Sequence, residues 1–187
     1  KTTTKDMIDT VLGSRFTGHA SPGNYNNQLG VPLGMLRWQD CDSYAVVEMG
    51  ARGHGDIANL CSLAKPTIGV ITNIGDAHVG SFGGPAALAE AKAELLEALP
   101  PDGLAVLNGD DRRLRKLAER SRAVIEWFGR GSDCHIVATD VRNAKGHLNF
   151  TVERERFRVS VWGRHHLTSA LAAIGVGRAF GLSLAEI

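Results

Sequence analysis

Short apolar runs alternate along the first two thirds of the chain with segments whose apolar residues recur at helical spacing. The runs are almost continuously apolar, which is typical of strands in a parallel sheet that helices cover on both faces. The predicted strands span residues 44–47, 68–72, 104–107 and 124–128. The predicted helices span about residues 3–12, 56–60, 85–99 and 112–120. This alternation predicts an α/β fold with a mostly parallel sheet flanked by helices.

The pattern changes in the C-terminal third. Period-two or mixed strands are predicted at residues 135–139, 148–152 and 157–162. Because polar turns separate them, they predict a small antiparallel sheet within about residues 134–162. Residues 167–180 return to helical spacing, and residues 183–187 resemble the start of another helix.

The segment from Ser14 to Pro32 is rich in glycine, asparagine and proline. These residues favour turns, so the composition predicts a long segment without regular structure. Irregular segments of this length inside a compact domain are usually functional or mobile. The segment is therefore a candidate for a functional loop.

The overall composition indicates one compact domain, because the chain has 187 residues and 43% of them are hydrophobic. The 21 basic and 20 acidic residues nearly balance, which gives no indication of nucleic-acid or anionic-membrane binding. No apolar run reaches the roughly 18 residues of a membrane span. Three widely spaced cysteines without a C-x-x-C pair fit a reducing cytosol. We expect a cytoplasmic monomer with no membrane span and no nucleic-acid partner.

The chain begins with Lys1-Thr2-Thr3-Thr4, directly before a predicted helix. A phosphate-binding loop has a glycine turn, then a lysine and a Ser or Thr at a helix start, because backbone N–H groups surround the phosphates and the hydroxyl binds Mg²⁺. These four residues supply only the last part of such a loop. A solvated helix N-terminus is the alternative. So abrupt a start also suggests excision from a longer protein.

Polar residues follow two of the predicted strands. Glu48 ends the first, and Asn73, Asp76 and His78 follow the second. Ligands bind at the carboxyl ends of strands in open α/β sheets, and a carboxylate there can hold Mg²⁺. The alternatives are that Glu48 is a surface residue, that Asp76 lies in an exposed turn, and that neighbouring groups in a loop satisfy the hydrogen bonds of His78.

These motifs, with several others, resemble the Mur ligase family. The motifs are Lys1-Thr2-Thr3-Thr4, 24–33, Glu48-Met49-Gly50-Ala51, 72–78, Ala91-Lys92 and Gly163-Arg164-His165-His166. The resemblance implies that residues 1–187 form the family's central ATP-binding domain, of P-loop type and truncated at both ends. Segment 24–32 followed by Glu48-Met49-Gly50-Ala51 is most similar to members that add D-alanyl-D-alanine to UDP-N-acetylmuramoyl-tripeptide. They use ATP and Mg²⁺ and form an acyl phosphate during peptidoglycan precursor synthesis.

The resemblance implies roles at the phosphates and the metal. Lys1 would be catalytic and would contact the ATP phosphates together with Thr2 and Thr3. Thr2 and Glu48 would hold Mg²⁺. The resemblance also implies a second Mg²⁺, served by two further catalytic residues, His78 and Lys92. Lys92 matches the family lysine that CO₂ carbamylates, whereas composition alone indicates a solvated helix charge.

The resemblance also implies substrate and nucleotide contacts. Asn26 and Asn27 would face the muramoyl-peptide substrate, although turn-forming asparagines are the alternative. Asn73 and His166 would line the nucleotide site. His166 departs from the family, which usually has asparagine there, and imidazole cannot offer an amide's paired donor and acceptor to adenine. For Asn108-Gly109-Asp110-Asp111, which also resembles a family segment, we favour capping of the next helix.

The sequence leaves two other functions open. One is another ligase of the superfamily, such as a different Mur-type enzyme or one like folylpolyglutamate synthetase. The other is a P-loop nucleotide-binding module without ligase chemistry. The fragment by itself is predicted to be inactive, because the family's N-terminal domain holds the UDP group and its C-terminal domain helps to close on ATP.

Overall fold

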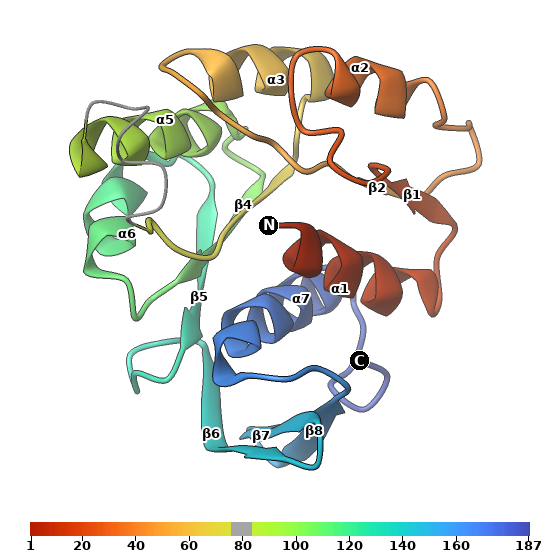
Figure 1. Cartoon of the computed structure of the whole chain (residues 1–187), viewed down its shortest axis with the longest axis vertical. Coiled ribbons are helices and arrows are strands. Elements are labelled where there is room, and N and C mark those ends of the chain that lie inside the picture. The colour runs from red at the N-terminus through yellow and green to blue at the C-terminus, as the bar shows by residue number, and fades with distance from the viewer. Residues whose placement is uncertain (76–83) are drawn as a thin grey trace.

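The computed structural model describes residues 1–75 and 84–187. A six-stranded sheet with the order β3-β4-β5-β6-β7-β8 forms its centre, and a parallel pair, β1-β2, lies beside α1 (Figure 1). Helices cover both faces of the parallel part of the larger sheet. The predicted α/β fold is therefore confirmed. Among the described residues, no helix is both long and apolar enough to cross a membrane.

The parallel part of the sheet consists of β3 (Ile68–Ile71), β4 (Leu104–Asn108) and β5 (Val124–Gly129). Alternate side chains of β4 enter different cores. Val106 packs with the helices of one face, whereas Ala105 and Leu107 pack with those of the other. A strand that is buried on both faces needs an apolar residue at each position, which explains the continuous apolar run.

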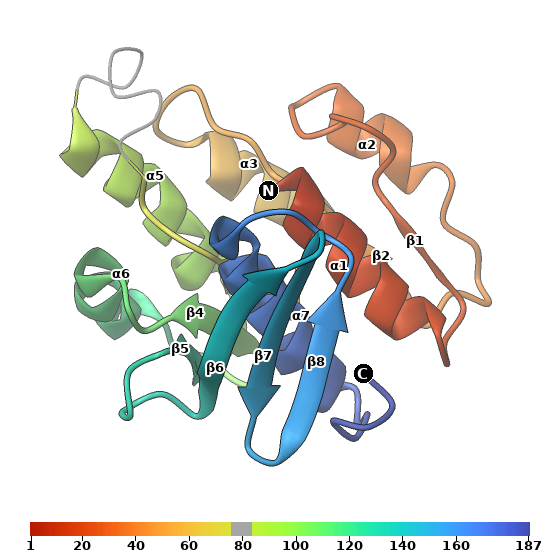
Figure 2. The same ribbon diagram turned by 60° about the horizontal axis from the view of Figure 1, so that its bottom comes forward.

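The antiparallel part consists of β6 (Ile136–Ala144), β7 (His147–Val152) and β8 (Glu155–Val159), shown in the foreground of Figure 2. The predicted antiparallel sheet is confirmed. It continues the parallel sheet, because β6 also pairs in parallel with β5. Lys145 and Gly146, with φ angles of 49° and 78°, join β6 to β7. Positive φ at both positions of a two-residue loop matches the twist of a hairpin.

Two helices pack side by side on one face of the sheet, α1 (Thr2–Gly13) and α7 (Leu167–Ala179) (Figure 1). The 3₁₀ turn η2 (Arg164–His166) leads into α7. The other core lies under α5 (Pro85–Ala98), α6 (Arg112–Leu117) and the 3₁₀ turn η1 (Ala118–Arg120). Helix α3 (Asp56–Ala64) packs against α5.

The expectation of no regular structure between Ser14 and Pro32 was wrong at two places. β1 (Gly18–Ala20) pairs with β2 (Tyr44–Val46), and α2 (Gly30–Met35) begins before the segment ends. At Gly18 the close approach of the strands requires glycine, since a Cβ would lie 2.4 Å from the Tyr44 carbonyl oxygen. A residue that indicated a turn therefore serves packing.

The C-terminal residues 183–187 form a single turn. The Ile187 N–H donates to the Ser183 carbonyl at 3.1 Å, and the Ser183 hydroxyl donates to the Glu186 carboxylate at 2.7 Å. These contacts reproduce the hydrogen bonds of a helix N-terminus within one turn.

Glu94 of α5 caps the neighbouring helix α3. Its buried carboxylate accepts from the Gly55 N–H at 2.6 Å and from the Ala58 N–H at 3.0 Å. Gly55, the N-cap residue of α3, has no side chain to supply this acceptor. We expect Glu94→Ala to lower the free energy of unfolding by about 0.5–2 kcal/mol, because two N–H groups at the start of α3 lose their capping acceptor.

Urea unfolding of the two variants Glu94→Ala and Glu97→Ala checks this prediction. Glu97 lies on the same helix, but its carboxylate is 45% exposed and pairs with Arg120 at the surface. An exposed pair contributes only about 0–1 kcal/mol. Equal losses in the two variants would contradict the capping role.

Candidate functional site

A cavity of about 670 Å³ lies beside the N-terminus of α1 and is also bordered by β2, β3 and η2. Six of the residues with predicted roles line it: Lys1, Thr3, Glu48, Asn73, Lys92 and His166. They come from five separate parts of the chain. The first turn of α1 contains no acidic residue, so its free N–H groups favour an anion at this end of the cavity.

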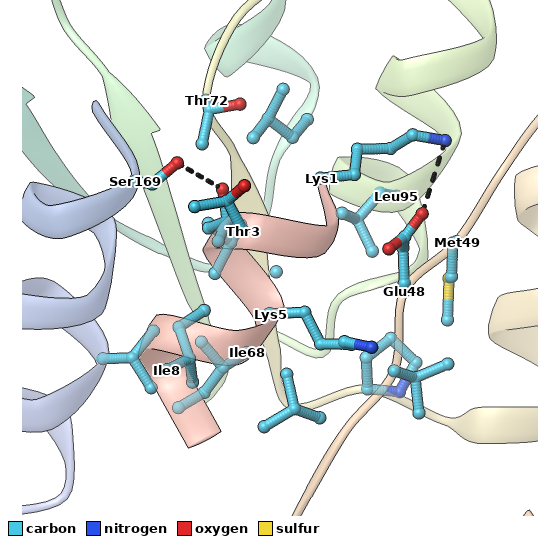
Figure 3. A pocket seen from close by; sticks show the side chains of 18 of the residues that line it. Lys1, Thr3, Lys5, Ile8, Glu48, Met49, Ile68, Thr72, Leu95 and Ser169 are labelled. Carbon is cyan, nitrogen blue, oxygen red and sulfur yellow. Dashed lines mark hydrogen bonds and ion pairs between the residues drawn. The ribbon is translucent and has the colours of Figure 1, made fainter. Parts of the chain in front are cut away.

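Glu48 is the centre of a hydrogen-bonded cluster at the end of β2. Its carboxylate accepts from the Thr2 hydroxyl at 2.8 Å and from the Asn26 side-chain amide at 2.8 Å. The Lys1 ammonium lies 3.9 Å from the same carboxylate (Figure 3). Because Glu48 is only 6% exposed, it is not a surface glutamate. The structure brings a hydroxyl, a carboxylate and an ammonium together beside a cavity.

The backbone around Glu48 is held by the glycine- and asparagine-rich loop. The Glu48 N–H donates to the Ser21 hydroxyl at 3.1 Å, and the Gly50 N–H donates to the Asn26 carbonyl at 2.6 Å. A Cβ at residue 50 would lie 3.1 Å from that carbonyl oxygen, so glycine permits the approach. Loop and strand end therefore form one unit.

The two predicted substrate residues of this loop have different surroundings. Asn26 directs its side chain to Glu48 and so lies next to the cluster. The Asn27 side-chain oxygen accepts from the N–H groups of Leu29 and Gly30, at 3.0 and 2.8 Å, and so supports the start of α2. The turn-forming alternative thus describes Asn27, while contact of either residue with a substrate stays a prediction.

Lys92 points from α5 toward the end of β3, where its ammonium donates to the Asn73 carbonyl. Burial lowers the pKa of Lys92, and the nearby charge of Lys1 lowers it further, whereas Asp111 opposes the shift. Lys92 is therefore not a solvated helix charge. It lines the same cavity as Lys1 and Glu48.

His166 lines the cavity from η2, beside His165. The two rings lie 4.0 Å apart between centroids, and burial together with His165 lowers the pKa of His166. His78 and Asp76 lie outside the described residues. Within residues 1–75 and 84–187, no group of three or more His, Cys, Asp or Glu side chains could hold a metal.

Asp111 caps α6 as expected, since its carboxylate accepts from the Arg113 N–H at 2.9 Å. The same carboxylate accepts from the Ile74 N–H at 2.7 Å, and the Arg113 guanidinium donates to the Ile74 carbonyl at 2.7 Å. These contacts fix the loop that carries Asn73. Sequence reasoning missed this second role, although the strand-end rule applied to Glu48 could have found it, because Asp111 follows the adjacent strand β4.

Two polar residues of α1 make buried contacts for which the sequence predicted no role. The Thr4 hydroxyl lies 2.9 Å from the Ser169 hydroxyl of α7, and both side chains are buried. Lys5 is also buried and binds the loop at Ser21. Threonine and lysine are mostly exposed in helices, so their residue types alone would place both at the surface.

Comparison with known proteins decides the family. The sequence profile described as the Mur ligase middle domain matches residues 1–177. The chain belongs to the Mur ligase family. This middle domain is 38% identical, over its whole length, to the UDP-N-acetylmuramoyl-tripeptide–D-alanyl-D-alanine ligase of Synechocystis and 32% identical to that of Escherichia coli. It spans only 40% and 43% of the lengths of those two relatives.

Solved structures agree with this assignment. A MurF structure from Acinetobacter baumannii matches all of the middle domain, and 41% of its own chain, with a TM-score of 0.91 and 31% identity. The MurF ligase of Thermotoga maritima in complex with ADP matches 97% of the middle domain, and 43% of its own chain, with a TM-score of 0.87 and 30% identity. The α/β architecture described above is thus the one found in MurF structures.

Proposed function

We propose that this middle domain works within an ATP-dependent ligase that adds D-alanyl-D-alanine to UDP-N-acetylmuramoyl-tripeptide. The observation that carries the proposal is the convergence of Lys1, Glu48, Asn73 and Lys92 around one cavity, where Thr2 is hydrogen-bonded to Glu48. The relatives named for this reaction support it, and this chain spans only 40% of their length. Their remaining domains would hold the UDP group and close on ATP, so the isolated domain is proposed to be inactive.

The nucleotide would bind at the N-terminus of α1. Lys1 would contact the phosphates and the N–H groups of Thr2 and Thr3 would surround them. Asn73 and His166 would lie toward the nucleoside. The ADP complex of the Thermotoga relative supports a nucleotide at this domain. Because the three cysteines are free, we place the enzyme in a reducing cytosol. We also propose that it is a monomer.

Mg²⁺ fits the pair of Thr2 and Glu48. The hydroxyl and carboxylate oxygens lie 2.8 Å apart, and Glu48 lines the cavity. Mg²⁺ prefers oxygen ligands and often takes only one or two from the protein. When bound, it would neutralise charge on the phosphates. His78 and a carbamate on Lys92 would hold a second Mg²⁺, and the position of Lys92 at the cavity together with its lowered pKa supports that modification.

The reaction demands that two anions approach one another. The tripeptide carboxylate would attack the γ-phosphorus, ADP would leave, and the D-alanyl-D-alanine amine would then displace phosphate from the acyl carbon. Lys1 would offset the negative charge, and the Glu48 cluster would keep the phosphate end of the cavity in place. The domain thus acts by charge and position, without a protein nucleophile.

Trapping of the acyl phosphate tests the proposal. With ATP, Mg²⁺ and UDP-N-acetylmuramoyl-tripeptide but no D-alanyl-D-alanine, the full-length enzyme should convert added hydroxylamine to a hydroxamate of the tripeptide. ADP should form only when the tripeptide nucleotide is present. ADP formation that does not depend on a carboxylate substrate would favour a P-loop module without ligase chemistry.

A further inference from the structure

Lys5 is a buried ammonium that the proposed reaction does not use. Its side chain is only 6% exposed, although it lies one helical turn after Lys1. Lysine is almost never buried to this extent unless its charge is satisfied. The ammonium donates to the Ser21 carbonyl at 2.7 Å and to the Gly23 carbonyl at 3.2 Å. The Asp6 carboxylate, 3.4 Å away, is largely exposed.

The carbonyls that Lys5 binds begin the loop that supports Glu48. Ser21 is shared between the two, because its carbonyl accepts from Lys5 and its hydroxyl accepts from the Glu48 N–H. A few residues further on, Asn26 donates to the Glu48 carboxylate. Figure 3 shows Lys1 and Lys5 projecting from the same side of α1 toward the strand end that carries Glu48.

We propose that Lys5 is a positioning residue that fixes loop 21–27 to the helix bearing the phosphate-binding end. This inference rests on the proposed function. Lys1 and Lys5 belong to one rigid helix, so this helix would hold the loop and the phosphates in fixed positions relative to each other. A small displacement of the loop would separate the tripeptide carboxylate from the γ-phosphate, and such displacements are costly to rates. Lys5 itself touches no substrate.

The test is steady-state kinetics of full-length Lys5→Met, a variant that keeps the apolar stem and removes the ammonium. We expect kcat to fall and the KM for UDP-N-acetylmuramoyl-tripeptide to rise by about tenfold, while the KM for ATP changes by less than about twofold. The matched control is Lys116→Met, because Lys116 is an exposed helix lysine far from the loop in sequence. Equal changes in both Michaelis constants, or none, would overturn the proposal.

A double-mutant cycle with Asn26→Ala separates positioning from general destabilisation. If Lys5 acts through the loop, the double variant should lose no more activity than the more impaired single variant. Fully additive losses would show that the two residues act independently. Should Lys5→Met fail to fold, Lys5→Arg takes its place, since the larger guanidinium displaces the same carbonyls and should shift the two Michaelis constants unequally.

Hydrogen exchange makes the inference testable without the reaction. Amides of residues 21–27 should exchange faster in the folded Lys5 variant, while those in the middle of α1 should keep the wild-type rate. Unchanged exchange in the loop would refute the positioning role. A wild-type enzyme that failed to ligate would refute the proposed function alone, because this measurement does not depend on activity.

Discussion

Replacing Glu48 with alanine is expected to lower kcat/KM of the full-length ligase by about a hundredfold or more. The carboxylate accepts from Thr2 and Asn26 and lies beside Lys1, so its removal disturbs the whole cluster. The variant also loses the carboxylate ligand proposed for Mg²⁺. Initial rates at several Mg²⁺ concentrations measure both effects, and the Mg²⁺ concentration for half-maximal rate should rise.

Two further variants show whether the charge of Glu48 matters. Glu48→Gln keeps the shape of the side chain, yet an amide can accept only through its oxygen and binds Mg²⁺ poorly. It should therefore be nearly as impaired as alanine. Glu119→Ala, at an exposed glutamate of η1, should behave as wild type. Full activity in Glu48→Gln would contradict a metal-binding role for this carboxylate.

Replacing Lys92 with alanine is expected to reduce kcat by about a hundredfold or more, and added short carboxylates such as acetate should restore part of it. An ammonium beside two Mg²⁺ ions would repel them, whereas a carbamate carries the opposite charge. The half-buried amine donates to the Asn73 carbonyl, and burial together with the nearby charge of Lys1 lowers its pKa, which disfavours its protonated form. Wild-type activity should also fall in buffer depleted of CO₂.

The control for Lys92 is Lys116→Ala, which removes an exposed lysine from a neighbouring helix. Neither acetate nor CO₂ depletion should distinguish it from wild type. If Lys92→Ala keeps its activity, or if wild type is indifferent to CO₂ and acetate rescues nothing, the carbamate is the wrong explanation for this lysine.

The elements that local periodicity determines could be predicted from the sequence. β4 lies between two cores, so its residues 104–107 are all apolar and the run is continuous. Lys145 and Gly146 mark a hairpin because their turn requires positive φ. Glu48 could be placed at the ligand edge of the sheet, because a charged residue directly after a buried strand lies at the strand's carboxyl end.

Features that depend on distant partners could not be predicted. Gly18 indicates a turn in sequence, and only the proximity of Tyr44 shows why a strand needs glycine there. Glu94 and Lys5 read as ordinary helix charges, since nothing local reveals the N–H groups or carbonyls that they bind across the fold. Motif order identified the cavity residues, but the hydrogen bond from Thr2 to Glu48 required the structure.

The proposed function places this domain in an enzyme that joins D-alanyl-D-alanine to UDP-N-acetylmuramoyl-tripeptide. The decisive measurement is phosphate release by the full-length protein with ATP and a panel of carboxylate and amine substrates. Rapid release is expected only with the tripeptide nucleotide and D-alanyl-D-alanine together, with a product that contains both. Preference for a single amino acid, for glutamate with a folate, or for no acceptor at all would contradict it.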